Sequence, residues 1–193
     1  GEEIKIYHTI HDDKDIAIYR TMIGGPATVL MMEELASRGV KKFIFFGSCG
    51  LLVNHLPSGT FIVPTEAYRD EGTSYHYLPA SEFVKVDSAV ELMHIFEMND
   101  ISFFTTKTWT TDAIYRETID KVKARVSKGC QVVEMECASV MAMCQRRGLK
   151  AYYFLYSDDT LAGDTWDLKT LKEDRSFILK ECLKIALKVA TEI

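Results

Sequence analysis

The sequence predicts one α/β domain that spans residues 1–193. Short, continuous apolar and aromatic runs are typical of strands buried on both faces. They alternate with longer amphipathic segments, most of which end at a glycine. Helices commonly end in this way. The chain is long enough for one domain with a substantial core, and no internal repeat, low-complexity segment or linker divides it.

The chain begins with two predicted strands, over residues 4–7 and 16–21, joined by a polar, Asp-rich stretch that predicts a hairpin. The Gly-Gly-Pro sequence at 24–26 then predicts a turn and the start of a helix that continues to about Arg38 and ends at Gly39. N–H groups at that helix start are able to hold an anion or a sugar hydroxyl. A simple tight turn is the interpretation that we favour for Gly-Gly-Pro.

A buried strand is predicted over residues 40–46, and it leads into a glycine-bracketed turn at 47–50. Glycines beside a hydroxyl at a strand end let the backbone approach a ligand closely. A turn at 57–59 and a strand over 60–64 follow. The glycine-bracketed turn is therefore a candidate ligand contact.

Aromatic and charged side chains gather in residues 105–117. Trp109 and Tyr115 are suited to framing a base, and Arg116 and Glu117 are suited to reading its edge. A surface loop that has no part in binding is an equally good explanation for these residues.

Two carboxylates, Glu134 and Glu136, precede a predicted helix over residues 138–147. A strand over 150–156 follows and delivers the sequence Ser-Asp-Asp at 157–159 to its carboxyl end, where open α/β sheets collect ligands. Each group of acids also has a plain structural interpretation. Glutamates interact favourably with a helix start, and aspartates are common in turns.

Two further helices are predicted. Residues 119–128 form a charged helix with a solvated face, and residues 168–193 form a closing helix with an apolar stripe. Asp164 and Asp167 lie near the start of the closing helix and are interpreted as cap residues.

Composition excludes several classes of function. The net charge of -5 without a basic stripe argues against nucleic-acid binding, and no apolar run approaches the roughly 18 residues of a membrane span. The five cysteines are odd in number and lack C-x-x-C spacing. This pattern favours reduced thiols in a cytoplasmic protein, and we expect no disulfide framework and no metal site.

Three motifs carry a resemblance to a known family: Gly39–Gly50, Val133–Ala138 and Tyr156–Asp158. In order and spacing they resemble the nucleoside phosphorylase family that contains hexameric purine nucleoside phosphorylases and uridine phosphorylases. The resemblance extends from about Ile4 to the last helix. It implies a single-domain, three-layer fold with a mixed, barrel-like central sheet flanked by helices, here lacking the usual amino-terminal strand and loop.

The resemblance also implies an activity. Family members use inorganic phosphate as co-substrate to cleave the N-glycosidic bond of a nucleoside reversibly, giving a free base and a pentose 1-phosphate. We expect a purine substrate, with uridine as the alternative, because the Gln-x-Arg pattern with which uridine enzymes grip the pyrimidine is not visible here. No cofactor is expected. The expected partners are a nucleoside, phosphate and copies of the chain itself, as a dimer or a trimer of dimers.

Residue by residue, the resemblance assigns roles to the matching positions. Glu136 matches the glutamate that binds the ribose 2′- and 3′-hydroxyls, and Asp158 matches the acid that protonates or hydrogen-bonds the base nitrogen. The remaining matches are Met135 and Glu134 for ribose, Ser48 and Gly47 for phosphate, and Ile114, Tyr115 and Ser157 for the base.

These roles suit the chemistry. Breaking the glycosidic bond develops positive charge on the ribose ring and negative charge on the departing base. A carboxylate that holds the sugar hydroxyls orients the ring and favours the cation. An acid beside the base stabilises the leaving group, best when burial moves its pKa towards neutrality.

The sequence departs from the family pattern after Asp158, where the arginine that supports the acid in purine enzymes is missing, and also on the phosphate side. Phe45 stands where family members carry a phosphate-binding arginine, and phenylalanine cannot hold an anion. Three alternatives stay open. Arg20, Arg69 or Arg116 supplies the positive charge; the protein is a nucleoside hydrolase that uses water; or it is a catalytically impaired nucleoside-binding homologue.

Overall fold

Five strands close into a mixed, barrel-like sheet. The computed structural model describes residues 5–163 and 176–193. Its strands pair in the order β4–β6–β7–β3–β8, and β8 pairs back with β4 to close the ring. The bounds are β3 (Lys42–Leu51), β4 (Phe61–Asp70), β6 (Phe104–Thr111), β7 (Cys130–Glu134) and β8 (Lys150–Thr160), with the short strand β5 (Phe83–Lys85) added to β4. The expected barrel-like mixed sheet is confirmed.

Strand direction decides which strand ends meet. β3 runs parallel to β8, and β4, β6 and β7 run parallel to one another. The two groups are joined by antiparallel pairs, β4 with β8 and β3 with β7. Because Gly50 pairs with Val133, the carboxyl end of β3 lies beside the carboxyl end of β7. The acids expected at the ends of β7 and β8 are thereby brought to the same region.

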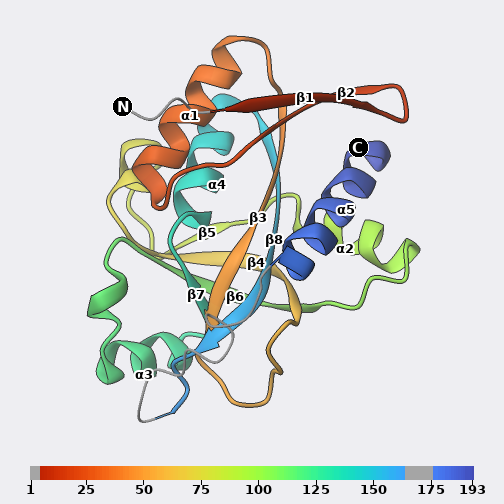
Figure 1. The fold of residues 1–193 in the computed structure, drawn as a ribbon. Helices are drawn as coiled ribbons and strands as arrows, with labels where there is room; N and C mark the ends of the chain where they lie inside the picture. The colour runs from red at the N-terminus through yellow and green to blue at the C-terminus, as the bar shows by residue number, and fades with distance from the viewer. Residues whose placement is uncertain (1–4, 164–175) are drawn as a thin grey trace.

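Helices cover both sides of the sheet (Figure 1). α1 (Gly25–Ser37) and α4 (Cys137–Arg147) lie together on one side, and α2 (Ala89–Met98) and α5 (Ser176–Glu192) lie on the other. α3 (Ile119–Ser127) lies beside β7. Single 3-10 turns occur at Thr73–His76 (η1) and Ile114–Arg116 (η2). The predicted helices after Gly-Gly-Pro, before Gly148 and over the charged stretch are confirmed.

Aromatic side chains of β8 fill the core. Tyr152, Tyr153 and Phe154 are fully buried, as expected for a strand covered on both faces. Phe154 contacts Phe46 of β3 and Phe96 of α2, with ring centroids 5.6 and 5.5 Å apart. The contact with Phe96 joins the sheet to α2.

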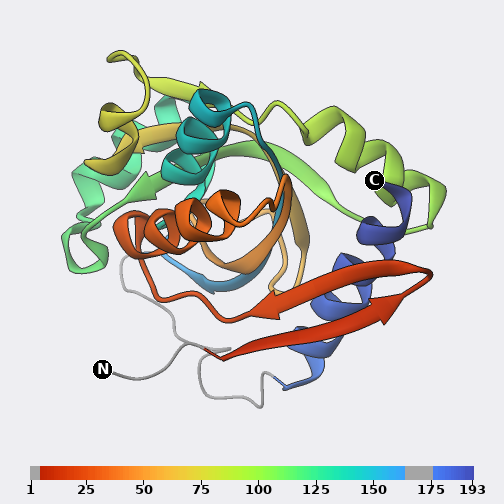
Figure 2. The same ribbon diagram turned by 90° about the horizontal axis from the view of Figure 1, so that it is seen from above.

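The amino-terminal hairpin is formed by β1 (Ile6–His11) and β2 (Lys14–Tyr19), which pair in an antiparallel sheet of their own. Its turn is two residues long, because Asp12 and Asp13 take left-handed conformations with φ of 47° and 61°. The hairpin precedes α1 in the chain and passes α5 (Figure 2), where Lys14 Nζ donates to the carbonyl of Ile193 at 2.5 Å.

The predicted turn at 47–50 and the segment after the predicted strand 150–156 are strand instead. β3 continues through residues 47–51, and β8 continues through 157–160, so the glycines and the acids expected after the strands lie within them. The two segments pair with each other, and that pairing supplies the backbone hydrogen bonds that a turn would otherwise need. Of the closing helix, only residues 176–192 are described; its expected start at Leu168 and the caps Asp164 and Asp167 lie outside the described residues, as does the first strand residue Ile4. None of the helices in the described ranges has the length and apolarity that a bilayer crossing requires.

Candidate active site

The candidate site lies where the carboxyl ends of β3, β7 and β8 meet. Close packing there depends on Gly50, since a Cβ at this position would lie 2.8 Å from Cδ1 of Leu161 and 3.1 Å from Cγ1 of Val133. Cys49, the preceding residue, is buried among the acids. Burial raises the pKa of its thiol well above the ordinary value, and the charges of Glu134, Asp159 and Asp158 raise it further. The acids of β7 and β8 therefore all lie near the Cys49 thiol.

A β-bulge sets the position of Asp158. Cys49 pairs with Ser157, whereas Gly50 pairs with Asp159, so Asp158 is the extra residue of β8. Bulges redirect side chains and are common beside active sites. The side chain of Asp158 is buried, with 5% of the residue exposed, and that of Asp159 is half-buried. The two adjacent acids thus occupy different environments.

Glu134 is a buried carboxylate that holds the start of α4. Both of its oxygens accept hydrogen bonds, and the two backbone N–H donors lie at the first turn of the helix, where such groups need partners. The donors are the hydroxyls of Thr108 (3.3 Å), Thr110 (2.5 Å) and Tyr153 (2.9 Å), and the N–H groups of Glu136 (2.7 Å) and Cys137 (2.7 Å). Burial raises the pKa of Glu134, and these donors oppose the rise. This side chain therefore has a capping role in the fold, and its expected ribose contact stays a prediction.

Glu136 lies at the N-cap of α4 and reaches across to the loop before α1. Its Oε1 accepts the backbone N–H of Gly24 at 2.6 Å. Burial, and then the charge of Glu134, raises the pKa of Glu136 to about 7. A carboxyl group poised near neutrality at a helix start is a candidate for a functional role.

The loop before α1 can approach α4 only because Gly25 has no side chain. A Cβ there would lie 2.2 Å from Oγ and 2.8 Å from Cβ of Ser139. Ser139 in turn donates to buried Glu71 at 2.5 Å. The Gly24–Glu136 contact therefore depends on close packing between two helices, in addition to the tight turn predicted at this position.

The expected phosphate side is formed by exposed Ser48 and half-buried Gly47, both on β3. Phe45, two residues before Gly47, stacks on Tyr153 with ring centroids 4.5 Å apart and an angle of 5° between the rings. Met135 is half-buried between the two glutamates. Among the described residues, no basic side chain forms an ion pair with Glu134 or Glu136.

One of the three candidate arginines is excluded from phosphate binding. Arg69 is buried and holds the loop after β4, where it lies 4.0 Å from the ring centre of Tyr75. Its guanidinium donates to Ser74 Oγ (2.8 Å), Pro79 O (2.7 Å) and Ser81 Oγ (2.8 Å). Arg20 and Arg116 are exposed, and neither forms an ion pair with another residue in the described ranges.

The residues expected beside the base divide into two groups. Ile114 and Tyr115 lie on η2 and are exposed, Tyr115 at 87%. Glu117 follows them; burial, and then the charge of Asp159, raises its pKa to about 7. This links the end of η2 to the acids of β8.

Two polar or aromatic candidates are used elsewhere. The hydroxyl of buried Ser157 accepts from the N–H of Thr60 and donates to the carbonyl of Pro57, each at 3.0 Å, so it supports the 57–60 turn. Its expected base contact stays a prediction. Trp109 is fully buried and donates to Asp70 at 3.1 Å, so the expectation that it frames a base is wrong.

Sequence reasoning missed Gly24 as the partner of Glu136, and Tyr153 as the partner of Glu134. Both contacts join segments far apart in the chain, and an apolar run gives no sign that one tyrosine hydroxyl has a carboxylate partner.

A shallow hollow of about 590 Å³ lies elsewhere, between the 78–87 segment and the end of α4. Its lining includes only one carboxylate, Asp87. The chemistry therefore places the candidate site at the acids and away from this hollow.

Comparison with known proteins gives a consistent family. A model of the phosphorylase superfamily matches residues 1–193. The chain is 34% identical over 154 residues to guanosine phosphorylase from Halorubrum lacusprofundi, covering 78% of this chain and 64% of that protein. It is 30% identical over 156 residues to uridine phosphorylase from Salmonella typhimurium, covering 72% and 62%. The chain thus spans slightly less than two thirds of the length of these curated relatives.

The fold has a close counterpart among solved structures. The crystal structure of purine nucleoside phosphorylase from Toxoplasma gondii in complex with immucillin-H superposes with a TM-score of 0.83 at 27% sequence identity. The match covers 97% of this chain and 77% of that one.

Proposed function

The chain belongs to the phosphorylase superfamily, and from that premise we propose that it is a nucleoside phosphorylase. The proposed reaction is the reversible, phosphate-dependent cleavage of an N-glycosidic bond, which releases a free base and a pentose 1-phosphate. The observation that carries the proposal is the arrangement of acids at the ends of β7 and β8, which both lie beside the end of β3. Glu136 is held by Gly24, and Asp158 is set apart by a bulge.

On the sugar side, Glu136 accepts hydrogen bonds from the ribose 2′- and 3′-hydroxyls, and Met135 packs under the ring. The hydrogen bond from Gly24 N–H supports this role because it fixes the carboxylate of Glu136 between the starts of α1 and α4. Glu134 serves as a positioning residue, since its oxygens already accept five donors from the protein. A group held in this way orients the ring before the bond breaks.

On the base side, Asp158 stabilises the leaving group. As the bond between C1′ and the base nitrogen breaks, its electron pair stays with the base, and Asp158 donates a proton or a hydrogen bond to that base. Ile114 and Tyr115 form the wall beside it. Burial of Asp158 at the bulge, with Asp159 in a more open environment, supports Asp158 as the acid.

On the nucleophile side, a phosphate oxygen forms the new bond to C1′, and Ser48 and the backbone of Gly47 contact the phosphate. Arg116 and Arg20 are the candidates for its charge partner, because both are exposed and Arg69 is occupied. We further propose that the substrate is a purine nucleoside, with uridine as the alternative. The relatives of this chain include a guanosine phosphorylase and a uridine phosphorylase.

The working form of the protein is proposed to be a cytoplasmic homo-oligomer, a dimer or a trimer of dimers. Support for the compartment comes from the cysteines, which are all buried and free. Inorganic phosphate is the proposed co-substrate, and no other cofactor is proposed.

A nucleoside hydrolase is the second candidate, and one observation favours it. Phe45 occupies the phosphate-side position with an aromatic ring stacked on Tyr153, and the carboxylates nearby are negatively charged when ionised. A neutral nucleophile such as water avoids the repulsion that a phosphate dianion meets there.

The test is base release from a panel of inosine, guanosine, adenosine and uridine, with and without phosphate, by wild type, Asp158→Asn and the matched control Asp159→Asn. We expect phosphate-dependent release, lowered about 100-fold in Asp158→Asn and little changed in Asp159→Asn, because a positioned general acid contributes about 10²–10⁴-fold. Release indifferent to phosphate would identify the hydrolase. Binding without release would identify a nucleoside-binding homologue, and uridine-only release would remove Asp158 from the acid role.

A further inference from the structure

Tyr153 carries a hydroxyl in a position that otherwise demands only an apolar ring. The side chain is fully buried in β8, and its ring lies parallel to that of Phe45 at 4.5 Å. A buried hydroxyl is costly unless it is hydrogen-bonded. This one donates to Oε2 of Glu134 at 2.9 Å. Phenylalanine would fill the same space, so the hydroxyl serves the contact with Glu134.

Oε2 of Glu134 is where β8 meets the start of α4. This oxygen also accepts the backbone N–H groups of Glu136 and Cys137, each at 2.7 Å, whereas the other oxygen accepts the threonines of β6. Without the tyrosine hydroxyl, Oε2 keeps only the two backbone donors and is no longer fixed from the side of β8. Its position, and that of the backbone it holds, becomes less restricted.

Glu136 receives this restriction directly. Its N–H is held by Glu134, and its carboxylate is held by Gly24 N–H at 2.6 Å. The backbone anchor comes from the barrel, and the side-chain anchor comes from the loop before α1. A carboxylate that must meet two sugar hydroxyls needs its position fixed to a fraction of an ångström.

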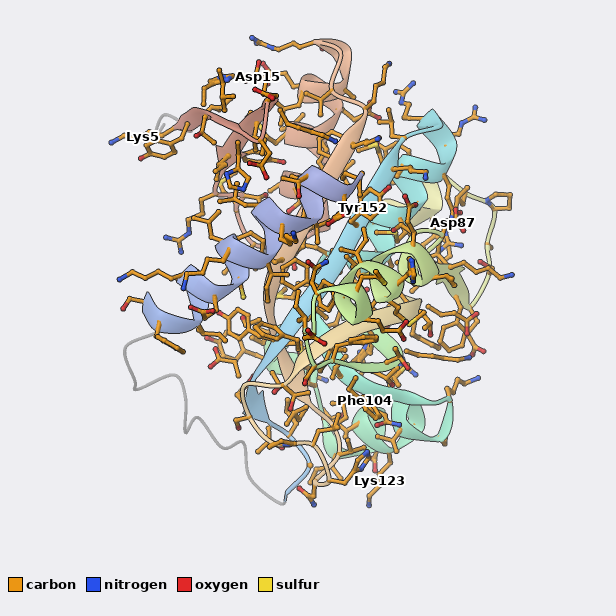
Figure 3. All side chains as sticks on the ribbon, turned by 90° about the vertical axis from the view of Figure 1, so that its right-hand side faces the viewer. Lys5, Asp15, Asp87, Phe104, Lys123 and Tyr152 are labelled. Carbon is orange, nitrogen blue, oxygen red and sulfur yellow. The ribbon has the colours of Figure 1, made fainter. Side chains whose placement is uncertain are left out.

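The neighbouring residue offers a matched contrast. Tyr152 is equally buried, and its hydroxyl donates to Oε1 of Glu91 on α2, also at 2.9 Å. Successive residues of a strand point to opposite faces. Figure 3 labels Tyr152 on β8 where α2 and α5 lie, on the other side of the sheet from α4. Two adjacent tyrosines thus make the same kind of bond, and only that of Tyr153 leads to the candidate site.

We propose that Tyr153, braced by Phe45, is a positioning residue that acts through Glu134 to fix the sugar-binding carboxylate of Glu136. The inference rests on the proposed function for its effect on turnover. In this chain, the stacked rings of Phe45 and Tyr153 secure the sugar side of the site, and neither ring carries a charge.

The experiment compares Tyr153→Phe with Tyr152→Phe in the full chain. The first readout is hydrogen exchange of the Glu136 and Cys137 amides without any substrate. In Tyr153→Phe these amides should exchange about tenfold faster than in wild type, since the oxygen that accepts them has lost its third partner. In Tyr152→Phe they should exchange as in wild type.

The second readout is kinetic. Tyr153→Phe should lower kcat/KM for a ribonucleoside about tenfold and lower it less for the 2′-deoxyribonucleoside, which offers Glu136 one hydroxyl fewer. Tyr152→Phe should leave both values within about twofold. A purely structural role would reduce activity on both substrates equally, in step with stability.

The outcomes separate the positioning role from the proposed function. Unchanged exchange at Glu136 and Cys137 in Tyr153→Phe, or an equal change in Tyr152→Phe, overturns the positioning role. Faster exchange without selective loss of the ribonucleoside overturns it as well. If wild type releases no base at all, the proposed function fails, while the exchange measurement still decides whether Tyr153 fixes Glu136.

Discussion

At the scale of single residues, the two glutamates of β7 and α4 show how local environment separates roles. Glu134 and Glu136 are two residues apart, yet one accepts five protein donors and the other reaches a single backbone N–H of a distant loop. The sequence predicts both as sugar ligands or both as helix-start acids. Which of them has capacity left for a ligand depends on Thr108, Thr110 and Tyr153, and no local pattern identifies these partners.

The raised pKa of Glu136 predicts a conflict between stability and function. The ordinary value of 4.5 rises to about 7 in the folded protein, so the folded state binds this proton more tightly than the unfolded chain. The contribution of Glu136 to stability is therefore greatest below about pH 4.5 and is lost as pH rises through about 7.

Glu136→Gln removes the ionisation and keeps an oxygen for the N–H of Gly24. At pH 8 we expect the variant to be about 1–2 kcal/mol more stable than wild type in urea denaturation, with the difference shrinking towards pH 5. Base release should fall steeply in the same variant, because the amide no longer favours the cationic ring. Equal stability of the two proteins across this range would contradict a buried, ionising Glu136.

At the scale of elements, the candidate site depends on α1 packing closely against α4. Gly25→Ala would place a Cβ 2.2 Å from Oγ of Ser139 and should separate the two helix starts. We expect a loss of about 1–3 kcal/mol in unfolding free energy, as for other overpacked contacts. Gly72→Ala is the matched control, since its Cβ would meet nothing closer than Asp112 Oδ2 at 3.8 Å.

Urea denaturation of both variants checks this prediction, together with nucleoside affinity. Gly25→Ala should also weaken nucleoside binding, because the Gly24 N–H would move away from Glu136. Equal stability of Gly25→Ala and Gly72→Ala would show that the two helix starts do not pack as closely as described.

Glycine and proline residues at the starts and ends of elements made most of the elements predictable from the sequence. The Gly-Gly-Pro start of α1 and the Gly148 end of α4, which takes a left-handed conformation, are local signals that tertiary contacts did not override. The ends of β3 and β8 were predicted too early. Polar and glycine residues there continue as strand because each strand supplies the hydrogen-bond partners of the other, and this pairing is not a local property.

At the scale of the whole molecule, ring closure brings the site together. The pairing of β4 with β8 closes the sheet, and the antiparallel pairing of β3 with β7 sets Glu134 beside the bulge at Asp158. Alternating strands and helices predict an α/β domain, but apolar patterning alone does not distinguish an open sheet from a closed one. The closed form was expected only from the family resemblance, as were the separate roles of Glu136 and Asp158.

The most direct test of the proposed phosphorylase activity identifies the sugar product. Wild-type protein would be incubated with inosine and inorganic phosphate, and the phosphorus NMR spectrum would be recorded over time. The proposal predicts that the phosphate signal falls while a pentose 1-phosphate signal grows in equal amount to the released base. Release of base with free ribose and an unchanged phosphate signal would contradict it and would assign the chain to the hydrolases.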